Sequence, residues 1–224
     1  MFKEKPITAG NKPQNLTDWV YETLEEAIIS HSLKSGEEIP EYRLAEMLGT
    51  SNTPVREALN RLITDGLVVK EPNKAPRVIS LSKKEIEELY DIRSVLEGLA
   101  IASATAAITD KELEMLQELQ NQGESYYRLG SINEYKNYNR QFHNSILAIS
   151  RNNLLMQMMV SINKKVQFCL SATVLIPGGM ERGVGDHRQL LEAVLAKNPG
   201  KAKALMEQHI LAGKADYLRN IQNL

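Results

Sequence analysis

The chain has 224 residues, of which 42% are hydrophobic and 25% are charged, and its formal net charge is -1. This composition is typical of a soluble globular protein with one large domain or two modest ones, and no apolar run approaches the roughly 18 residues of a membrane span. A single cysteine, Cys169, excludes an intramolecular disulfide and a thiolate-rich zinc cluster. Because the net charge is nearly zero, any binding to nucleic acid must depend on a local basic patch.

The first segment, residues 1–14, contains Pro6, Gly10 and Pro13 and is expected to form a flexible arm. It lacks the apolar core of a signal peptide, so we expect a cytoplasmic protein without membrane association. From residue 15 to about residue 32, apolar residues recur every three or four positions, which predicts an amphipathic helix. Its apolar positions include Leu16, Val20, Leu24, Ala27 and Ile28.

The next segment, PEYRLAEMLGTSNTPVREALNRLITDGLVV at residues 40–69, predicts two short helices joined by a tight link. Gly49 ends the first helix. Thr53 offers a hydroxyl N-cap to the second, and Pro54 then takes the first helical position, where no N–H is needed. The apolar residues of the second helix share one side. The other side is left with Arg56, Asn60 and Arg61. The pattern is that of a helix-turn-helix equipped for DNA contact.

Two β-prone runs follow, at residues 67–70 and 77–81, with EPNKAP between them. They predict a hairpin with Lys74 at its tip. Three helices and a hairpin make a winged helix, so we predict a DNA-binding domain over residues 15–81.

Residues 82–224 predict helices almost throughout. The expected helices cover residues 83–108, 110–129, 131–149, 153–176, 183–197 and 199–222. Short links between them imply an antiparallel bundle. Its core would receive two apolar stripes, one through Leu89, Ile92, Leu96 and Leu99 and one through Leu154, Met158 and Val166. The predicted fold class is therefore mainly α, with an N-terminal winged helix-turn-helix and an all-α antiparallel helical bundle.

The helical half contains three of the four histidines, His143, His187 and His209, and Asn139 precedes His143 by four residues. This spacing places Asn139 and His143 on one face of a helix. Three imidazoles and an amide oxygen would suit a divalent transition metal with positions left for water or a ligand. The alternative is that each histidine is a hydrogen-bonded core or boundary residue, because spacing alone does not show that three helices meet.

Arg93 lies four residues before Glu97 on an expected helix. The default interpretation of such a pair is an ion pair on the helix surface. The alternative is a buried arginine that meets the carboxylate of a ligand.

Several segments resemble one known family. LAEMLGTSNTPVREALNRLITDGLVV closely resembles the DNA-binding region of the GntR family of bacterial transcription regulators. LYDIRSVLEGLA, NRQFHNSI, GDHRQLLEAVLAKNP and MEQHI are similar to segments of the helical effector domain, called FCD, of the FadR branch of that family, and they occur in the family order. The resemblance extends from about Asn15 to Tyr217.

The resemblance implies a homodimer that binds two half-sites of a pseudo-palindromic double-stranded DNA operator. It also implies that each helical domain binds a small effector, commonly an organic or sugar acid. In many relatives a zinc or nickel ion is held by an aspartate and three histidines, and the effector binds at or near it. Those positions are occupied here by Asn139, His143, His187 and His209. Asparagine in place of aspartate removes a charge, so the metal affinity is expected to be lower.

Other functional residues follow from the same resemblance. Arg93 matches an arginine placed to meet the carboxylate of the effector, and Thr53 and Arg56 fall on DNA-contact positions. Asn52 stands where many relatives have arginine and Ala75 where glycine is usual, which implies an altered operator preference. We expect Asn52, Thr53, Arg56 and Asn60 nearest the bases and Arg61, Lys70 and Lys74 nearer the phosphates.

The sequence thus predicts a ligand-responsive transcription regulator, expected to be a repressor, in which an effector shifts the two recognition helices relative to each other. One alternative is a regulator whose helical half only dimerises. A second is a metal-dependent hydrolase, but the chain has no HExxH motif and no carboxylate at helical spacing from His143 that could act as a general base.

Overall fold

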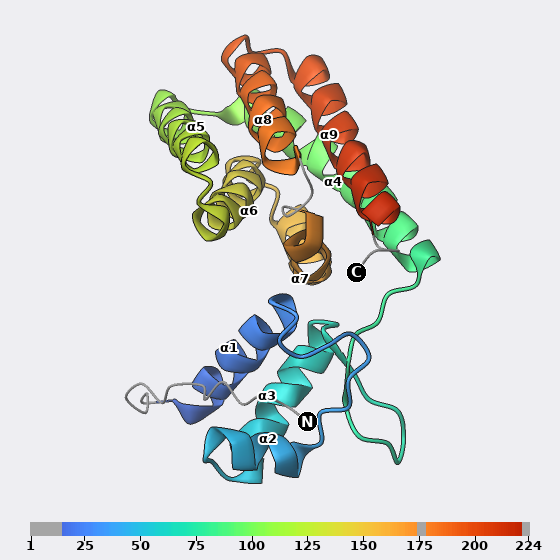
Figure 1. Ribbon diagram of the computed structural model, residues 1–224. Coiled ribbons are helices and arrows are strands. Elements are labelled where there is room, and N and C mark those ends of the chain that lie inside the picture. The colour runs from blue at the N-terminus through green and yellow to red at the C-terminus, as the bar shows by residue number, and fades with distance from the viewer. Residues whose placement is uncertain (1–14, 174–177, 221–224) are drawn as a thin grey trace. The chain divides into compact units, whose positions relative to one another are not determined.

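The computed structural model describes residues 15–173 and 178–220. The expected flexible arm, residues 1–14, lies outside the described residues. The chain divides into two compact units, the first ending at Ser80 and the second beginning at Leu81. The described residues are mainly helical, with one small sheet in the first unit (Figure 1). The predicted fold class is confirmed.

The first unit contains three helices and a two-stranded antiparallel sheet. In chain order these are α1 (Leu16–Ile29), α2 (Glu41–Leu48), α3 (Asn52–Thr64), β1 (Val68–Val69) and β2 (Arg77–Val78). Asn15 caps α1 by accepting hydrogen bonds from the backbone N–H groups of Thr17 and Asp18. Helices α1 and α3 pack together through buried apolar side chains. These include Val20, Leu24 and Ile28 from α1 and Val55, Leu59 and Leu62 from α3.

The boundaries of α3 and of the hairpin differ from those predicted. Helix α3 begins at Asn52, with Ser51 rather than Thr53 in the N-cap position. Pro54 is still tolerated, because it lies in the first turn, where backbone N–H groups have no partner within the helix. The strands are shorter than expected, and the other edge of β2 bonds to the segment before α2, where the N–H of Val78 donates to Glu37 and the N–H of Ile39 donates to Pro76.

The second unit is a bundle of helices. They are α4 (Lys83–Ala107), α5 (Asp110–Leu129), α6 (Ile132–Ile149), α7 (Asn153–Thr173), α8 (Gly179–Leu195) and α9 (Pro199–Asn220). Helix α4 lies along α9, and α5 packs against α6 and α8 (Figure 1). Capping boxes begin two of the helices, one from Ser82 and Glu85 and one from Thr109 and Glu112. Helix α8 starts at Gly179, earlier than the predicted residue 183.

The predicted inward face of α4 is wrong. Ile92 and Leu99 are 54% and 45% exposed, and the buried face instead carries Tyr90, Arg93 and Glu97. Helix α4 has apolar residues on two sides, so the hydrophobic periodicity alone did not show which side is buried. The second predicted stripe is also partly wrong, because Leu154 and Met158 are exposed while Val166 is buried.

Candidate metal centre and DNA-contacting surface

Three helices of the second unit bring three histidines to one point. His143 from α6, His187 from α8 and His209 from α9 each offer a ring nitrogen, and these nitrogens lie within 4.8 Å of one another. Nitrogens that share one metal ion at about 2.1 Å can lie no more than about 4.2 Å apart. Small side-chain adjustments would therefore bring all three to a common ion. His143 and His187 are buried, and His209 is half-buried.

Each of the three rings is held by its Nδ1 atom. His143 pairs with Glu97, His187 with the Tyr138 hydroxyl at 2.9 Å and His209 with Asp186 at 2.9 Å. A carboxylate only accepts hydrogen bonds, so the rings facing Glu97 and Asp186 carry the proton on Nδ1 and a lone pair on Nε2. Histidines that bind metals are oriented in this way by a partner of the second ring nitrogen.

The tautomer of His187 is set by a relay of side chains. The Tyr138 hydroxyl donates to Oε1 of Gln120 at 2.6 Å, and the amide of Gln120 is oriented by its own bond to the Val184 carbonyl at 3.1 Å. Because the hydroxyl proton is committed to Gln120, the Tyr138 oxygen accepts from Nδ1 of His187. Gly123 makes this arrangement possible, since a Cβ there would lie 2.3 Å from the Tyr138 ring.

The Nε2 atoms of His143 and His187 are buried and have no hydrogen-bond partner in the described part of the chain. A buried polar atom without a partner is costly and calls for an explanation. Burial lowers the pKa of His143, against the opposing effect of Glu97, and it lowers the pKa of His187 well below its ordinary value. Both shifts favour the neutral ring, which is the form that binds a metal. The donor set fits a zinc or nickel ion.

The predicted surface pair of Arg93 and Glu97 is in fact buried. Nε of Arg93 donates to Oε1 of Glu97 at 2.6 Å, and the two side chains are 4% and 1% exposed. Burial alone would raise the pKa of Glu97, but Arg93 and His143 outweigh it and hold this pKa well below its usual range. The carboxylate therefore stays ionised and links α4 to the histidine on α6.

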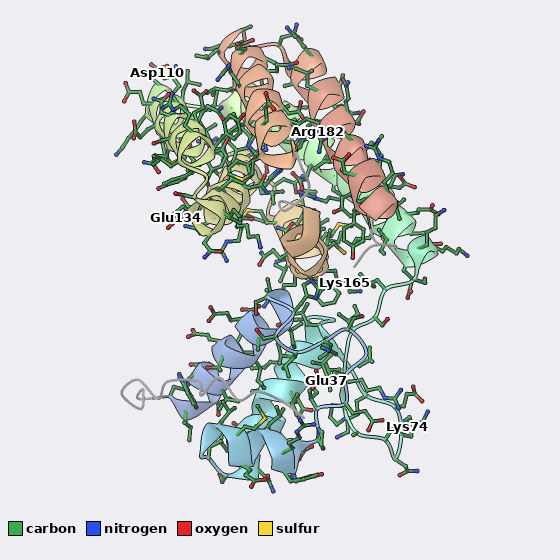
Figure 2. All side chains as sticks on the ribbon, viewed as in Figure 1. Glu37, Lys74, Asp110, Glu134, Lys165 and Arg182 are labelled. Atoms are coloured by element: carbon green, nitrogen blue, oxygen red, sulfur yellow. The ribbon has the colours of Figure 1, made fainter. Side chains whose placement is uncertain are left out.

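A cavity of about 60 Å³ adjoins the histidines. Its wall contains Arg93, Asn139, His143 and His209, together with Tyr90, Tyr135, Arg182 and Asp216. The structure thus brings the predicted effector residue and predicted metal ligands to one site. Arg182, which is labelled in Figure 2, lies in the first turn of α8. It forms an ion pair with Asp216 of α9.

Sequence reasoning missed the residues that orient the histidines. Asp186 and Tyr138 each stand directly before a predicted ligand, which was a usable signal. No spacing rule connects Glu97 with His143, because they lie 46 positions apart on different helices. Tyr90 was also missed, although its hydroxyl is buried with no hydrogen-bond partner among the described side chains and backbone.

The seven predicted DNA-contacting residues are all exposed on the first unit. Five of them belong to α3 and one follows β1, namely Asn52, Thr53, Arg56, Asn60 and Arg61, and then Lys70. Lys74, which is labelled in Figure 2, lies in the loop between the strands. Arg61 hydrogen-bonds Asp18 at 2.5 Å and lies 4.0 Å above the Tyr21 ring, so it is held on the α1 side of α3.

The other cations of this surface also lie beside carboxylates. Glu41 accepts from Nε of Arg56 at 2.8 Å and lies 3.5 Å from the ammonium group of Lys70. Lys74 pairs with Glu71 at 2.5 Å. These pairs explain how a basic surface is compatible with a nearly neutral chain. Phosphates would have to compete with the carboxylates for the same cations.

Comparison with known families gives two matches, one in each unit. Residues 16–78 match the family described as bacterial regulatory proteins of the gntR family, and residues 88–212 match the FCD domain. The chain belongs to the GntR family. The resemblance seen in the sequence is confirmed, and the FCD match includes the candidate effector residue and metal ligands.

Individual GntR regulators resemble this chain over most of their length. The HTH-type regulator YdhC of Bacillus subtilis is 31% identical, with 86% of this chain and 84% of YdhC covered. McbR of Escherichia coli is 30% identical, with 86% and 88% covered, and GlaR of the same organism, described as a repressor, is 28% identical, with 85% and 90% covered. The solved structure of McbR superposes with a TM-score of 0.78 over 92% of this chain and 98% of that one.

These comparisons show a DNA-binding transcription regulator. The relatives are regulators and not enzymes, so the prediction of a protein without enzymatic activity is confirmed and the hydrolase alternative is set aside. Within the described residues, no helix has both the length and the apolar character to cross a membrane.

Proposed function

We propose that this regulator is a cytoplasmic homodimeric repressor. Its affinity for an operator would change when a small organic or sugar acid binds beside a metal ion in the helical domain. The observation that supports this most strongly is the meeting of ring nitrogens from three histidines next to a cavity that Arg93 helps to line. Repression is proposed by analogy with GlaR, which is described as a repressor.

The ion would be held by His143, His187, His209 and Asn139, and zinc or nickel suits these nitrogen and oxygen donors. When bound, the metal supplies a positive centre to which a carboxylate can coordinate. Arg93 would contribute the remaining N–H donors of its guanidinium, because only Nε is engaged with Glu97 in the described contacts. Burial of this pair keeps the arginine in a fixed position.

On the DNA side, α3 would enter the major groove. Its residues Asn52, Thr53, Arg56 and Asn60 would face the bases, and Lys70 and Lys74 would approach the phosphates together with Arg61. The two half-sites of an operator are about 34 Å apart or a multiple of this distance. A change of a few ångströms in the spacing of two recognition helices would therefore alter operator affinity.

The second copy of the chain would contact α4. Ile92, Val95 and Leu99 form an exposed apolar stripe on this helix, and such stripes mark interaction surfaces. Arg93 and Glu97 lie on the buried face of the same helix. Because Arg93 is held firmly by Glu97, a ligand that binds Arg93 would shift α4 together with it, and with α4 the surface that meets the partner. This arrangement favours an effector-responsive protein over one whose helical half only dimerises.

A thermal-shift screen tests the proposal. The chain, purified without chelator, is heated with organic and sugar acids in the presence and absence of Zn²⁺ or Ni²⁺, and a bound acid raises the melting temperature by mass action. Hits are then tested for their effect on operator binding. If no acid changes either quantity with either metal, the helical half only dimerises and the proposed effector role is wrong.

A further inference from the structure

A carboxylate lies between two cations of the proposed DNA-contacting surface. Glu41 is the first residue of α2, and its side chain is only 20% exposed. Its Oε2 atom accepts a hydrogen bond from Nε of Arg56 on α3 at 2.8 Å, and its Oε1 atom lies 3.5 Å from the ammonium group of Lys70. Because DNA is a polyanion, a carboxylate at this place weakens binding to the backbone. Its presence calls for a role other than affinity.

The start of α2 keeps Glu41 in a fixed place. Pro40 stands directly before it with a φ of -62°, and the Pro40 carbonyl accepts hydrogen bonds from the backbone N–H groups of Arg43 and Leu44. Leu44 is buried, so the inner face of the helix is anchored as well. The hydrogen bond from Arg56 outweighs the effect of burial and holds the pKa of Glu41 below its ordinary value. The carboxylate is therefore ionised at neutral pH.

The hydrogen bond to Glu41 leaves one edge of the Arg56 guanidinium for DNA. A guanidinium carries five N–H donors in a rigid plane, and Glu41 takes the donor on Nε. The two Nη groups make no hydrogen bond within the part of the chain that the structure describes, and the side chain is 61% exposed. Together these two groups form a donor pair that matches O6 and N7 of guanine.

Glu41 is a firmer partner than the other carboxylates of this surface. Asp18, which pairs with Arg61, has a side chain that is 50% exposed, and Glu71, which pairs with Lys74, has one that is 59% exposed. Ion pairs that are partly buried are screened much less by solvent and salt than exposed ones. The pair with Glu41 therefore persists where the pairs of Arg61 and Lys74 open readily.

We propose that Glu41 is a positioning residue for DNA recognition, which holds Arg56 in the orientation that reads a guanine and withholds it from the phosphates. The inference rests on the proposed base contact of Arg56 and adds the residue that acts through it. A free arginine side chain reaches the phosphates of any sequence, whereas a held one gains its full contact only from a correctly placed base. Glu41 thus lowers the affinity for DNA in general and raises the discrimination between sequences.

Selection from a duplex library tests this role without knowledge of the operator. The full chain is equilibrated with duplexes that contain a random segment of about 30 base pairs, which accommodates two half-sites one or two helical turns apart. The bound duplexes are sequenced, and the preference for each base at each position is compared among variants. Arg56→Ala identifies the guanine that Arg56 reads, because this variant loses its preference at that position.

Glu41→Ala should lower the guanine preference at that same position by about two- to tenfold, the usual cost of ordering one long side chain. Binding to the library as a whole should be retained. Glu41→Gln should lower the preference less, because its amide oxygen still accepts from Nε, although a neutral acceptor is about half as strong as a carboxylate. The preferences at other positions should not change in either variant.

Two controls separate positioning from charge. Glu71→Gln removes a carboxylate that pairs with Lys74 on the same surface at 2.5 Å. It should strengthen the binding of all sequences without altering any base preference. Lys70→Ala removes the other partner of Glu41 and should weaken the binding of all sequences equally. Melting temperatures close to that of the wild type show that the variants are folded.

Different failures have different meanings. If Arg56→Ala keeps every base preference of the wild type, the proposed base contact is wrong and the role of Glu41 with it. If Arg56→Ala loses a guanine preference that Glu41→Ala keeps in full, only the positioning role is wrong. An equal loss of preference at all positions in Glu41→Ala would also overturn it, because Glu41 would then act on the whole unit. Glu41→Gln decides the question if Glu41→Ala does not fold.

Discussion

The two units of this regulator use ion pairs in opposite ways. On the first unit Arg56, Arg61 and Lys74 pair with carboxylates at the surface, where such pairs contribute about 0–1 kcal/mol and exchange readily for other partners. In the second unit Arg93, Glu97 and His143 are buried, and removing one member of such a network leaves an uncompensated charge. The exposed pairs suit a surface that must give up its carboxylates for phosphates, whereas the buried network suits a site whose geometry must stay fixed.

The largest effect is expected from Glu97→Ala, which leaves Arg93 buried without its carboxylate. The free energy of unfolding should fall by about 3–5 kcal/mol, measured by urea denaturation. Asp18→Ala is the matched control, because it removes the carboxylate of an exposed pair and should change stability by less than about 1 kcal/mol. Equal losses in the two variants would remove the distinction between the units.

Tyr138→Phe should weaken metal binding while leaving all the proposed ligands in place. Without the hydroxyl, Nδ1 of His187 loses its partner and the tautomer is no longer fixed. Loss of such an orienting partner typically lowers metal affinity by 10–100-fold, which plasma emission after dialysis against a chelator can follow. His143→Ala gives the reference for loss of a ligand itself. Full metal retention by the phenylalanine variant would mean that the relay through Gln120 has no role in metal binding.

Arg56→Ala should remove specific operator binding. A base contact of this kind contributes about 1–3 kcal/mol of discrimination in each half-site, so in a gel-shift assay the affinity of the dimer for the operator should fall toward that for random DNA. The dimer should remain folded, because Arg56 is exposed and its pair with Glu41 contributes little. Wild-type affinity in this variant would contradict the assignment of α3 as the recognition helix.

The smallest effect is expected from Glu41→Gln. This change frees Arg56 and Lys70 from a shared carboxylate, so random DNA should bind up to about fivefold more tightly, consistent with the weak energy of exposed pairs. The dependence of binding on salt should become steeper by about one phosphate contact. Glu22→Gln, an exposed change on α1, controls for the altered net charge, and an equal gain there would show that the pairing with Glu41 is irrelevant.

Local patterns predicted the first unit well and the site in the second unit only in part. Gly49 ends α2 in the left-handed conformation, as its position indicated, and the apolar spacing of α3 gave the correct buried face. The histidines were correctly placed on helices, yet their convergence depends on how α6, α8 and α9 pack. The burial of Arg93 and Glu97 could not be predicted from their spacing, because an i to i+4 pair is the same in sequence whether it faces solvent or core. Ile92 and Leu99 were assigned to the core because α4 has apolar residues on two sides and their spacing does not show which side is buried.

Helix α4 carries the Arg93–Glu97 pair on its buried face and Ile92, Val95 and Leu99 on its exposed face. Substitutions are normally tolerated on the solvent side of a helix, where they change stability by less than about 0.5 kcal/mol. Helix α5 has such a side, whereas α4 would have almost none if its apolar stripe meets a second copy. We therefore expect the two helices to have diverged at different rates during evolution. Substitutions should accumulate on α5, whereas α4 should change only through paired substitutions that preserve both of its faces.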